Sequence, residues 1–165
     1  MYLKSFPPFE RFKTSTLLLW SLRKKVEFSA VYDGEKFCGL TYVTYDDDTV
    51  YLLYLAVSEK LRGQGYGSKI LTMLDERFPD KQIVIDIEPV VKTAKNYQQR
   101  LKRLRFYQRN GFKLTGEKLV DDDGEFVTMV SHHKFDHDAF LECVKKASLG
   151  LYKIELKETG ASDET

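Results

Sequence analysis

The chain has 165 residues, 42% of them hydrophobic, and a formal net charge of +1. Its length suits a single domain. Its net charge is too small to attract nucleic acid or an anionic membrane through long-range electrostatics. No apolar run approaches the roughly 20 residues of a spanning helix, and the two cysteines, Cys38 and Cys143, are far apart in sequence. We therefore expect a cytoplasmic protein with free thiols and with no nucleic-acid or membrane partner.

The first part of the chain is rich in predicted strands. Residues 12–25 permit an amphipathic helix. Two β-rich runs, 27–32 and 36–45, are joined by an Asp-Gly pair, which is typical of a hairpin turn. An Asp-rich turn leads into residues 49–57, whose nearly continuous apolar run predicts a central strand covered on both faces.

The second part alternates helices and strands. The expected elements are a helix over 66–78, a strand over 82–87, a helix over 93–110, strands over 112–120 and 126–133, a helix over 136–149 and a short strand within 150–156. Hairpins around one strand–helix–strand crossover predict an α/β fold with a mixed, mainly antiparallel twisted sheet and helices on both faces. We expect one domain, residues 1–156, and a disordered or frayed polar tail, residues 157–165.

A glycine-rich loop lies between the predicted central strand and the helix that follows it. It reads Arg62-Gly63-Gln64-Gly65-Tyr66-Gly67-Ser68. Such a loop before a helix aims unpaired N–H groups and the positive end of the helix dipole at one point, which suits a pyrophosphate. The alternative is a tight turn that binds nothing. The loop lacks the Gly-Lys-Ser/Thr ending of a triphosphate-binding loop, and its antiparallel context does not fit a dinucleotide fold.

These residues resemble the GNAT superfamily of N-acetyltransferases. The loop fits the motif R/Q-x-x-G-x-G/A, and both the preceding Leu55-Ala56-Val57 and the later Tyr107 with Gly111-Phe112 are similar to further landmarks of that superfamily. The resemblance covers about residues 28–130. It implies a V-shaped split between the strand ending at Val57 and the strand 82–87, with acetyl-CoA bound there as a co-substrate. The residues that it places at the cofactor are Leu55, Ala56, Val57, Arg62, Gly63, Gln64, Gly65, Tyr66, Gly67 and Ser68, with Asn96 as a weaker contact.

The activity implied by the resemblance is transfer of an acetyl group to a primary amine of a small molecule or a peptide, by direct attack. The alternative is a catalytically silent module that binds acyl-CoA as a sensor or interaction domain. Tyr107 is the candidate acid, because the family places a tyrosine four residues before the helix-ending glycine and a phenol keeps its proton at neutral pH. Its spacing after Leu101 and Leu104 also fits a core aromatic.

The candidate bases are two carboxylates at the end of the strand 82–87. Asp86 and Glu88 are expected on the same face of the strand, opposite Ile85 and Ile87. We favour Glu88 for its longer reach, although a polar strand end with no catalytic role also fits, and Glu59 is a weaker third choice. Some relatives carry an acid earlier on the central strand, where this chain has Tyr51.

The remaining features carry weaker signals. The histidines lack the spacing of a metal site, so no metal is expected. The arginine-rich helix 93–110 is read mainly as a solvated face, with one or two side chains near the cofactor phosphates. The superfamily's usual first strand is expected to be absent here, or replaced by a C-terminal segment. The exposed sheet edge allows either a monomer or a homodimer.

Overall fold

The computed structural model describes residues 1–6, 11–122 and 124–159. The strands are β1 (Val26–Asp33), β2 (Lys36–Tyr45), β3 (Thr49–Val57), β4 (Gln82–Ile87), β5 (Lys113–Asp121), β6 (Gly124–Val130) and β7 (Glu155–Glu158). The helices are α1 (Tyr2–Ser5), α2 (Thr14–Trp20), the 3-10 helix η2 (Glu59–Leu61), α3 (Tyr66–Arg77), α4 (Tyr97–Arg109) and α5 (His137–Ser148).

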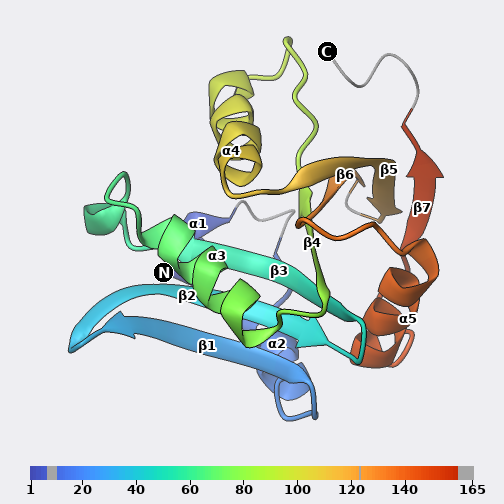
Figure 1. The fold of residues 1–165 in the computed structure, drawn as a ribbon, viewed down its shortest axis with the longest axis horizontal. Coiled ribbons are helices and arrows are strands. Elements are labelled where there is room, and N and C mark those ends of the chain that lie inside the picture. The colour runs from blue at the N-terminus through green and yellow to red at the C-terminus, as the bar shows by residue number, and fades with distance from the viewer. Residues whose placement is uncertain (7–10, 123, 160–165) are drawn as a thin grey trace.

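All seven of these strands join one sheet, in the order β1-β2-β3-β4-β6-β5-β7 (Figure 1). β1, β2 and β3 form an antiparallel meander, and β6 pairs antiparallel with both β4 and β5. The single parallel pair in this sheet, β3 with β4, is connected through α3. A parallel pair needs such a crossover, so the predicted mixed, mainly antiparallel sheet is confirmed.

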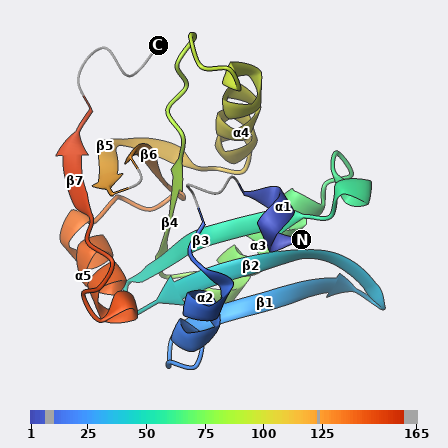
Figure 2. The same cartoon turned by 180° about the vertical axis from the view of Figure 1, so that it is seen from behind.

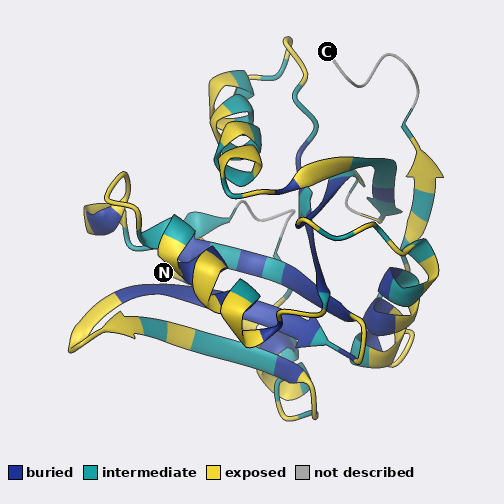
Figure 3. Ribbon diagram, in the orientation of Figure 1, coloured by how far each residue is buried: buried dark blue, intermediate teal, exposed yellow. Residues whose placement is uncertain are grey.

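Helices cover both faces of the sheet, as predicted. On one face, α3 buries Ile70, Leu71 and Leu74 against β2, β3 and β4, and α4 adds Leu104. On the other face, α1 and α2 lie over β1, β2 and β3, as the reverse view in Figure 2 shows, and they bury Tyr2 and Leu17 there. The helix α5 lies over Tyr51 and Val84 on this second face. Buried residues concentrate in β2, β3 and β4, while α4 has none (Figure 3).

The central elements have the predicted bounds, and the differences lie in the helices and the last strands. β3 and β4 span 49–57 and 82–87, as expected. α2 is shorter than the predicted 12–25, and α4 begins four residues later than predicted, at Tyr97 rather than at residue 93. β6 ends at Val130, so His132 and His133 follow the strand instead of belonging to it. Cys38 and Cys143 are buried free thiols, as expected.

The two ends of the described chain depart most from the usual superfamily plan. In the described ranges no strand precedes β1, and residues 2–5 form a helix instead, so the expected absence of a first strand is confirmed. The idea that a C-terminal segment replaces it is wrong, because β7 pairs with β5 at the far edge of the sheet. β7 also includes Lys157 and Glu158, which were expected in the frayed tail, whereas residues 160–165 lie outside the described residues.

None of the helices in the described ranges combines the length and the apolar character needed to cross a bilayer. Within the same ranges, no three His, Cys, Asp or Glu side chains gather where they would hold a metal ion. His132 lies 3.0 Å from Asp75, and His137 lies 2.6 Å from Glu117, in separate places.

Candidate functional site

β3 and β4 separate soon after they begin to pair. Their parallel register includes only Thr49, Val50 and Tyr51, which face residues 82–84, while β3 continues to Val57. On its other edge β3 carries a bulge, because Tyr42 of β2 faces Tyr54 and Val43 faces Leu52. A bulge bends a strand and increases its local twist. Beyond Tyr51, therefore, β3 turns away from β4 and, among the described strands, pairs only with β2, which confirms the predicted V-shaped split (Figure 1).

A cleft of about 580 Å³ lies along this split. Its lining includes residues 51–57 of β3, Asp86 of β4, and Arg103, Phe106 and Tyr107 of α4. Of the predicted cofactor residues on β3, all three from Leu55 to Val57 line this cleft. Because no strand of the described residues pairs with this edge of β3, the outward N–H and C=O groups between Leu55 and Val57 are suited to a partner from outside the sheet.

The glycine loop forms a second hollow, of about 360 Å³, that continues the cleft. The lining shared by the two consists of Leu55, Val57, Arg62, Arg103, Phe106 and Tyr107. The second hollow adds Gly63, Gly65, Tyr66, Gly67, Ser68 and Arg109. Gln64 lines neither hollow, because its side-chain amide donates to the Lys60 carbonyl at 2.8 Å. One groove thus runs from the start of α3 to Asp86.

The loop has the backbone geometry of an anion site. Gly63 and Gly65 have φ values of 76° and 81°, which favour glycine. The first bond of α3 runs from the Lys69 N–H to the Gly65 carbonyl at 3.0 Å. The N–H groups of Tyr66, Gly67 and Ser68 therefore lie at the positive end of the helix dipole and donate no hydrogen bond within the helix.

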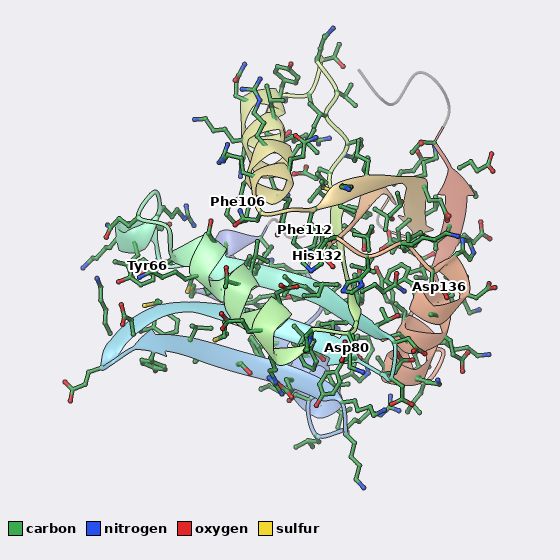
Figure 4. All side chains as sticks on the ribbon, in the orientation of Figure 1. Tyr66, Asp80, Phe106, Phe112, His132 and Asp136 are labelled. Carbon is green, nitrogen blue, oxygen red and sulfur yellow. The ribbon has the colours of Figure 1, made fainter. Side chains whose placement is uncertain are left out.

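Gly67 is required for a different reason. A Cβ at this position would lie 2.9 Å from the ring of Phe106. Figure 4 shows Phe106 at the end of α4 that faces the start of α3, where Tyr66 begins the helix. The absence of a side chain at Gly67 thus lets α3 and α4 approach each other at the junction of the two hollows.

Gly65→Ala is expected to weaken coenzyme A binding several-fold. An alanine at φ 81° costs about 1–2 kcal/mol, and relieving that strain would turn the amides of residues 66–68 away from one another. Gly34→Ala is the matched control, since it also places alanine at positive φ with no atom within 4 Å, but in the β1–β2 hairpin turn. The melting temperature should fall by a similar amount in both variants. Isothermal titration calorimetry should show weaker binding of coenzyme A only in Gly65→Ala. Equal affinities in the two variants would contradict this assignment.

Tyr107 is held at the cleft by the way α4 ends. The Phe112 N–H donates to the Tyr107 carbonyl at 3.1 Å, and the Gly111 N–H donates to the Gln108 carbonyl at 3.1 Å. With Gly111 at φ 86°, this is a Schellman motif. The Tyr107 ring lies between Phe106 and Phe112, with centroids 5.0 and 5.5 Å away. The spacing of Tyr107 before Gly111-Phe112 therefore encodes a helix end that fixes the phenol.

The Tyr107 hydroxyl remains a proton donor over the neutral range. Burial raises the pKa of Tyr107 to about 12, although the nearby Arg103 charge lowers it. No other described residue hydrogen-bonds this hydroxyl. The side chain therefore presents a protonated phenol to both hollows.

Asp86 is the carboxylate that the structure brings to the cleft. Its Oδ1 accepts a hydrogen bond from the Thr128 hydroxyl at 2.8 Å, while Oδ2 is buried and makes no hydrogen bond of ordinary geometry to a described residue. Burial raises the pKa of Asp86 to about 7; the Thr128 and Tyr51 hydroxyls lower it, and the Asp121 charge raises it. A carboxylate with such a pKa is basic enough to take a proton near neutrality.

Glu88, the base favoured from sequence, lies elsewhere. It follows the end of β4, is buried, and lies 2.8 Å from Arg100 and 3.1 Å from Arg103 of α4. The Asn96 amide adds a hydrogen bond of 3.1 Å to it. Neither Glu88 nor Asn96 lines the cleft or the loop hollow. The geometry therefore does not support the preference for Glu88 or the cofactor contact of Asn96, because both side chains join α4 to the end of β4. Glu59 lies in η2 and lines neither hollow.

Some lining residues were predicted only as a group, and others were not predicted at all. One or two basic side chains of the helix 93–110 were expected near the cofactor phosphates, and Arg103 and Arg109 are the ones that line the loop hollow. Asp121 was read as part of a hairpin turn and Tyr152 as part of a strand, yet both line the cleft beside Asp86. No local pattern marks these positions, because β5 and the C-terminal segment reach the cleft only through the sheet order.

The chain resembles known proteins in both sequence and fold. A family model described as an acetyltransferase (GNAT) domain matches residues 24–114, which is more than half of the chain. YjbC of Bacillus subtilis (strain 168), a protein described as an acetyltransferase, is 40% identical over 67 residues, covering 41% of this chain and 32% of YjbC. The match thus spans about a third of the length of this curated relative.

Three solved structures illustrate the likeness in fold. A protein of Bacteroides thetaiotaomicron described as a GNAT-family acetyltransferase has a TM-score of 0.67 and 24% identity, covering 88% of this chain and 83% of its own. The ribosomal-protein-S18-alanine N-acetyltransferase of Escherichia coli has a TM-score of 0.53 and 14% identity, with coverages of 76% and 77%. An aminoglycoside 6′-N-acetyltransferase complexed with coenzyme A has a TM-score of 0.50 and 15% identity, with coverages of 67% and 74%. Together with the family model, the split sheet and its glycine loop show that this chain belongs to the GNAT acetyltransferase family.

Proposed function

We propose that the chain transfers the acetyl group of acetyl-CoA to a primary amine by direct attack, with Asp86 as the base and Tyr107 as the acid. The observation that carries the proposal is the continuous groove. The amides at the start of α3 lie at one end of it, the Leu55–Val57 edge of β3 lies in its middle, and Tyr107 and Asp86 lie beyond. Two fold relatives, the S18-alanine and aminoglycoside 6′-N-acetyltransferases, are named for N-acetyl transfer.

The groove suits a coenzyme A thioester. The amides at the start of α3 and the guanidinium groups of Arg62, Arg103 and Arg109 suit a pyrophosphate. The free groups on the β3 edge suit the two amides of a pantetheine arm. When bound there, acetyl-CoA supplies an activated thioester carbonyl.

Asp86 is placed to remove a proton that the incoming amine must lose. An amine that arrives as an ammonium loses two protons from its nitrogen. One passes to the Asp86 carboxylate and frees the lone pair that bonds to the carbonyl carbon, and the other passes to solvent after that bond has formed. The buried Oδ2, which makes no hydrogen bond of ordinary geometry to a described residue, is the acceptor in this proposal. A pKa of about 7 makes the carboxylate a stronger base than an ordinary aspartate while it is still substantially ionised at neutral pH.

Tyr107 is placed to supply a proton to the leaving group. When the carbon–sulfur bond breaks, its electron pair stays on sulfur, and the Tyr107 phenol gives its proton to that sulfur. Arg103 lines the same stretch of the groove and lowers the pKa of the phenol, which favours this transfer. Asp86 and Tyr107 then exchange protons with solvent and return to their starting states.

The test combines binding with turnover. Coenzyme A should raise the melting temperature more than ATP or NAD at equal concentration, since a ligand at 100 times its Kd stabilises the fold by about 2.7 kcal/mol. Acetyl-CoA consumption should then depend on an added amine from a panel of small amines, amino acids and peptides. Stabilisation by coenzyme A without transfer to any amine would contradict the enzyme and support the silent binding module. Stronger stabilisation by ATP or NAD would contradict both.

A further inference from the structure

One end of the cleft has a wall of aromatic side chains. This aromatic end is the part of the cleft that the loop hollow does not share, and its rings are Phe6, Phe12, Tyr51, Tyr54, Phe126 and Tyr152. They come from the N-terminal segment, β3, β6 and the C-terminal segment. The wall is built of direct ring contacts: Phe6 lies 4.7 Å from Tyr54, and Phe12 meets Tyr152 edge to face at 5.0 Å.

Two carboxylates belong to the same end of the cleft. Asp121 accepts the Tyr152 hydroxyl at 2.7 Å, so the hairpin carboxylate is fixed to the aromatic wall. Asp86 and Asp121 are close enough that the charge of Asp121 raises the pKa of Asp86. Both are lining residues of the cleft.

Asp86 has no cation of its own among the described residues, in contrast to Glu88, which has two arginines. A poorly solvated carboxylate without a cation is costly, and a cationic ligand with good geometry offsets that cost. The buried Oδ2 atom, which makes no hydrogen bond of ordinary geometry to a described residue, marks the carboxylate at which such a ligand would be bound.

We propose that the acceptor is a small arylalkylamine, meaning a primary ammonium joined by a short chain to an aromatic ring, with the ammonium at Asp86 and Asp121 and the ring against the aromatic end. This inference rests on the proposed function and narrows its acceptor. Rings favour offset-stacked or edge-to-face contacts with other rings, and an ammonium near ring faces gains cation–π attraction. A polyamine has no ring to pack against the aromatic wall, and an aromatic alcohol has no positive charge to place at Asp86.

Most of the aromatic end lies outside the part of the chain that the family model matches. Phe6, Phe12, Phe126 and Tyr152 fall before or after residues 24–114. The acceptor preference thus depends on this chain's terminal segments and last hairpin as well as on Tyr51, Tyr54 and Asp86 of the matched domain.

The first experiment compares ligands on the unmodified chain with coenzyme A present. 2-Phenylethylamine should bind at least 10-fold more tightly by calorimetry than 2-phenylethanol, which lacks the charge, and than spermidine, which lacks the ring. With acetyl-CoA, its kcat/KM should exceed that of spermidine or a peptide N-terminus by at least 10-fold. Faster transfer to spermidine or a peptide would overturn this inference and leave the proposed function standing. No coenzyme A binding and no transfer to any amine would overturn both.

The second experiment tests the carboxylate at the wall. Asp121→Asn should raise KM for 2-phenylethylamine about 10-fold and leave the Kd of coenzyme A unchanged, because Asp121 does not line the loop hollow. Asp122→Asn is the matched control, since Asp122 is exposed and adjacent in sequence, and its KM should be that of the unmodified chain. An unchanged KM in a folded Asp121→Asn variant would overturn the ammonium site. If this variant fails to fold, the ligand comparison on the unmodified chain decides.

Discussion

Tyr107→Phe is expected to lower kcat by about 10²–10⁴-fold, the range typical of losing one general acid. The change removes a single hydroxyl and keeps the ring, so the contacts with Phe106 and Phe112 remain. The Schellman motif also remains, because it uses the Tyr107 carbonyl. Steady-state assays of acetyl-CoA consumption should therefore show a fall in kcat, while calorimetry shows a Kd for coenzyme A within about twofold of the unmodified value.

Tyr97→Phe is the matched control for this prediction. Tyr97 is the first residue of α4, and it lines neither the cleft nor the loop hollow. Removing its hydroxyl should leave kcat unchanged. If Tyr107→Phe keeps kcat within threefold of the unmodified chain while Tyr97→Phe behaves as expected, then Tyr107 is a packing residue, which its helical spacing also allowed.

The parts of the site that were predictable from sequence are those that short segments determine by themselves. Gly63 and Gly65 adopt positive φ, and Gly111 ends α4, so each glycine reports a backbone conformation that few other residues adopt. The bounds of β3 and β4 were correct because polar turns flank their apolar runs. The start of α4 was predicted too early, since helical spacing does not mark a first turn. Asn96 directly precedes the first residue of α4, and its side-chain oxygen accepts a hydrogen bond from the Arg100 Nε–H at 2.7 Å.

The choice between Asp86 and Glu88 was beyond local reasoning. Alternation along a strand puts both on one face, and it correctly placed Asp86 opposite Ile85. However, β4 ends at Ile87, and Arg100 and Arg103 reach Glu88 from a helix later in the chain. These arginines lie one helical turn apart, so both face the same partner. Their pairing with Glu88 depends on how α4 crosses the sheet, which no short segment encodes.

The aromatic end was unpredictable for the same reason. Phe12 and Tyr152 lie near opposite ends of the chain. Their ring centroids lie 5.0 Å apart because the strand order places β6, β5 and β7 next to β4. The absence of a strand before β1 in the described ranges was predicted. The arrangement of the N-terminal segment could not be predicted from sequence. In the structure α1 and α2 cover the second face of the sheet, and Phe6 and Phe12 line the cleft.

Asp86→Asn is expected to reduce activity and increase stability at the same time. The rate should fall by about 10²–10⁴-fold, because an amide does not accept the amine's proton. In the unmodified chain kcat/KM should rise with pH through a midpoint near 7, as Asp86 ionises, and the variant should lose this limb of the profile. Asp80→Asn removes an exposed carboxylate in the turn before β4 and is the control for charge alone, so its profile should be unchanged.

The stability effect follows from the same raised pKa. Between the ordinary pKa of 3.8 and the folded value of about 7, the folded chain keeps a proton on Asp86 that the unfolded chain has released. The folded state then binds more protons than the unfolded state, so this site lowers the free energy of unfolding as pH rises across that window. Above pH 7 this loss in the free energy of unfolding is complete.

The Asp86→Asn variant has no carboxylate at this position and does not lose that stability as pH rises. Its melting temperature should therefore exceed that of the unmodified chain at pH 8 and match it near pH 4. A lower melting temperature than that of the unmodified chain at pH 8 would show that Asp86 is a structural hydrogen-bonding residue. A gain in stability with a loss of rate is instead the signature of a carboxylate kept in an unfavourable environment for catalysis.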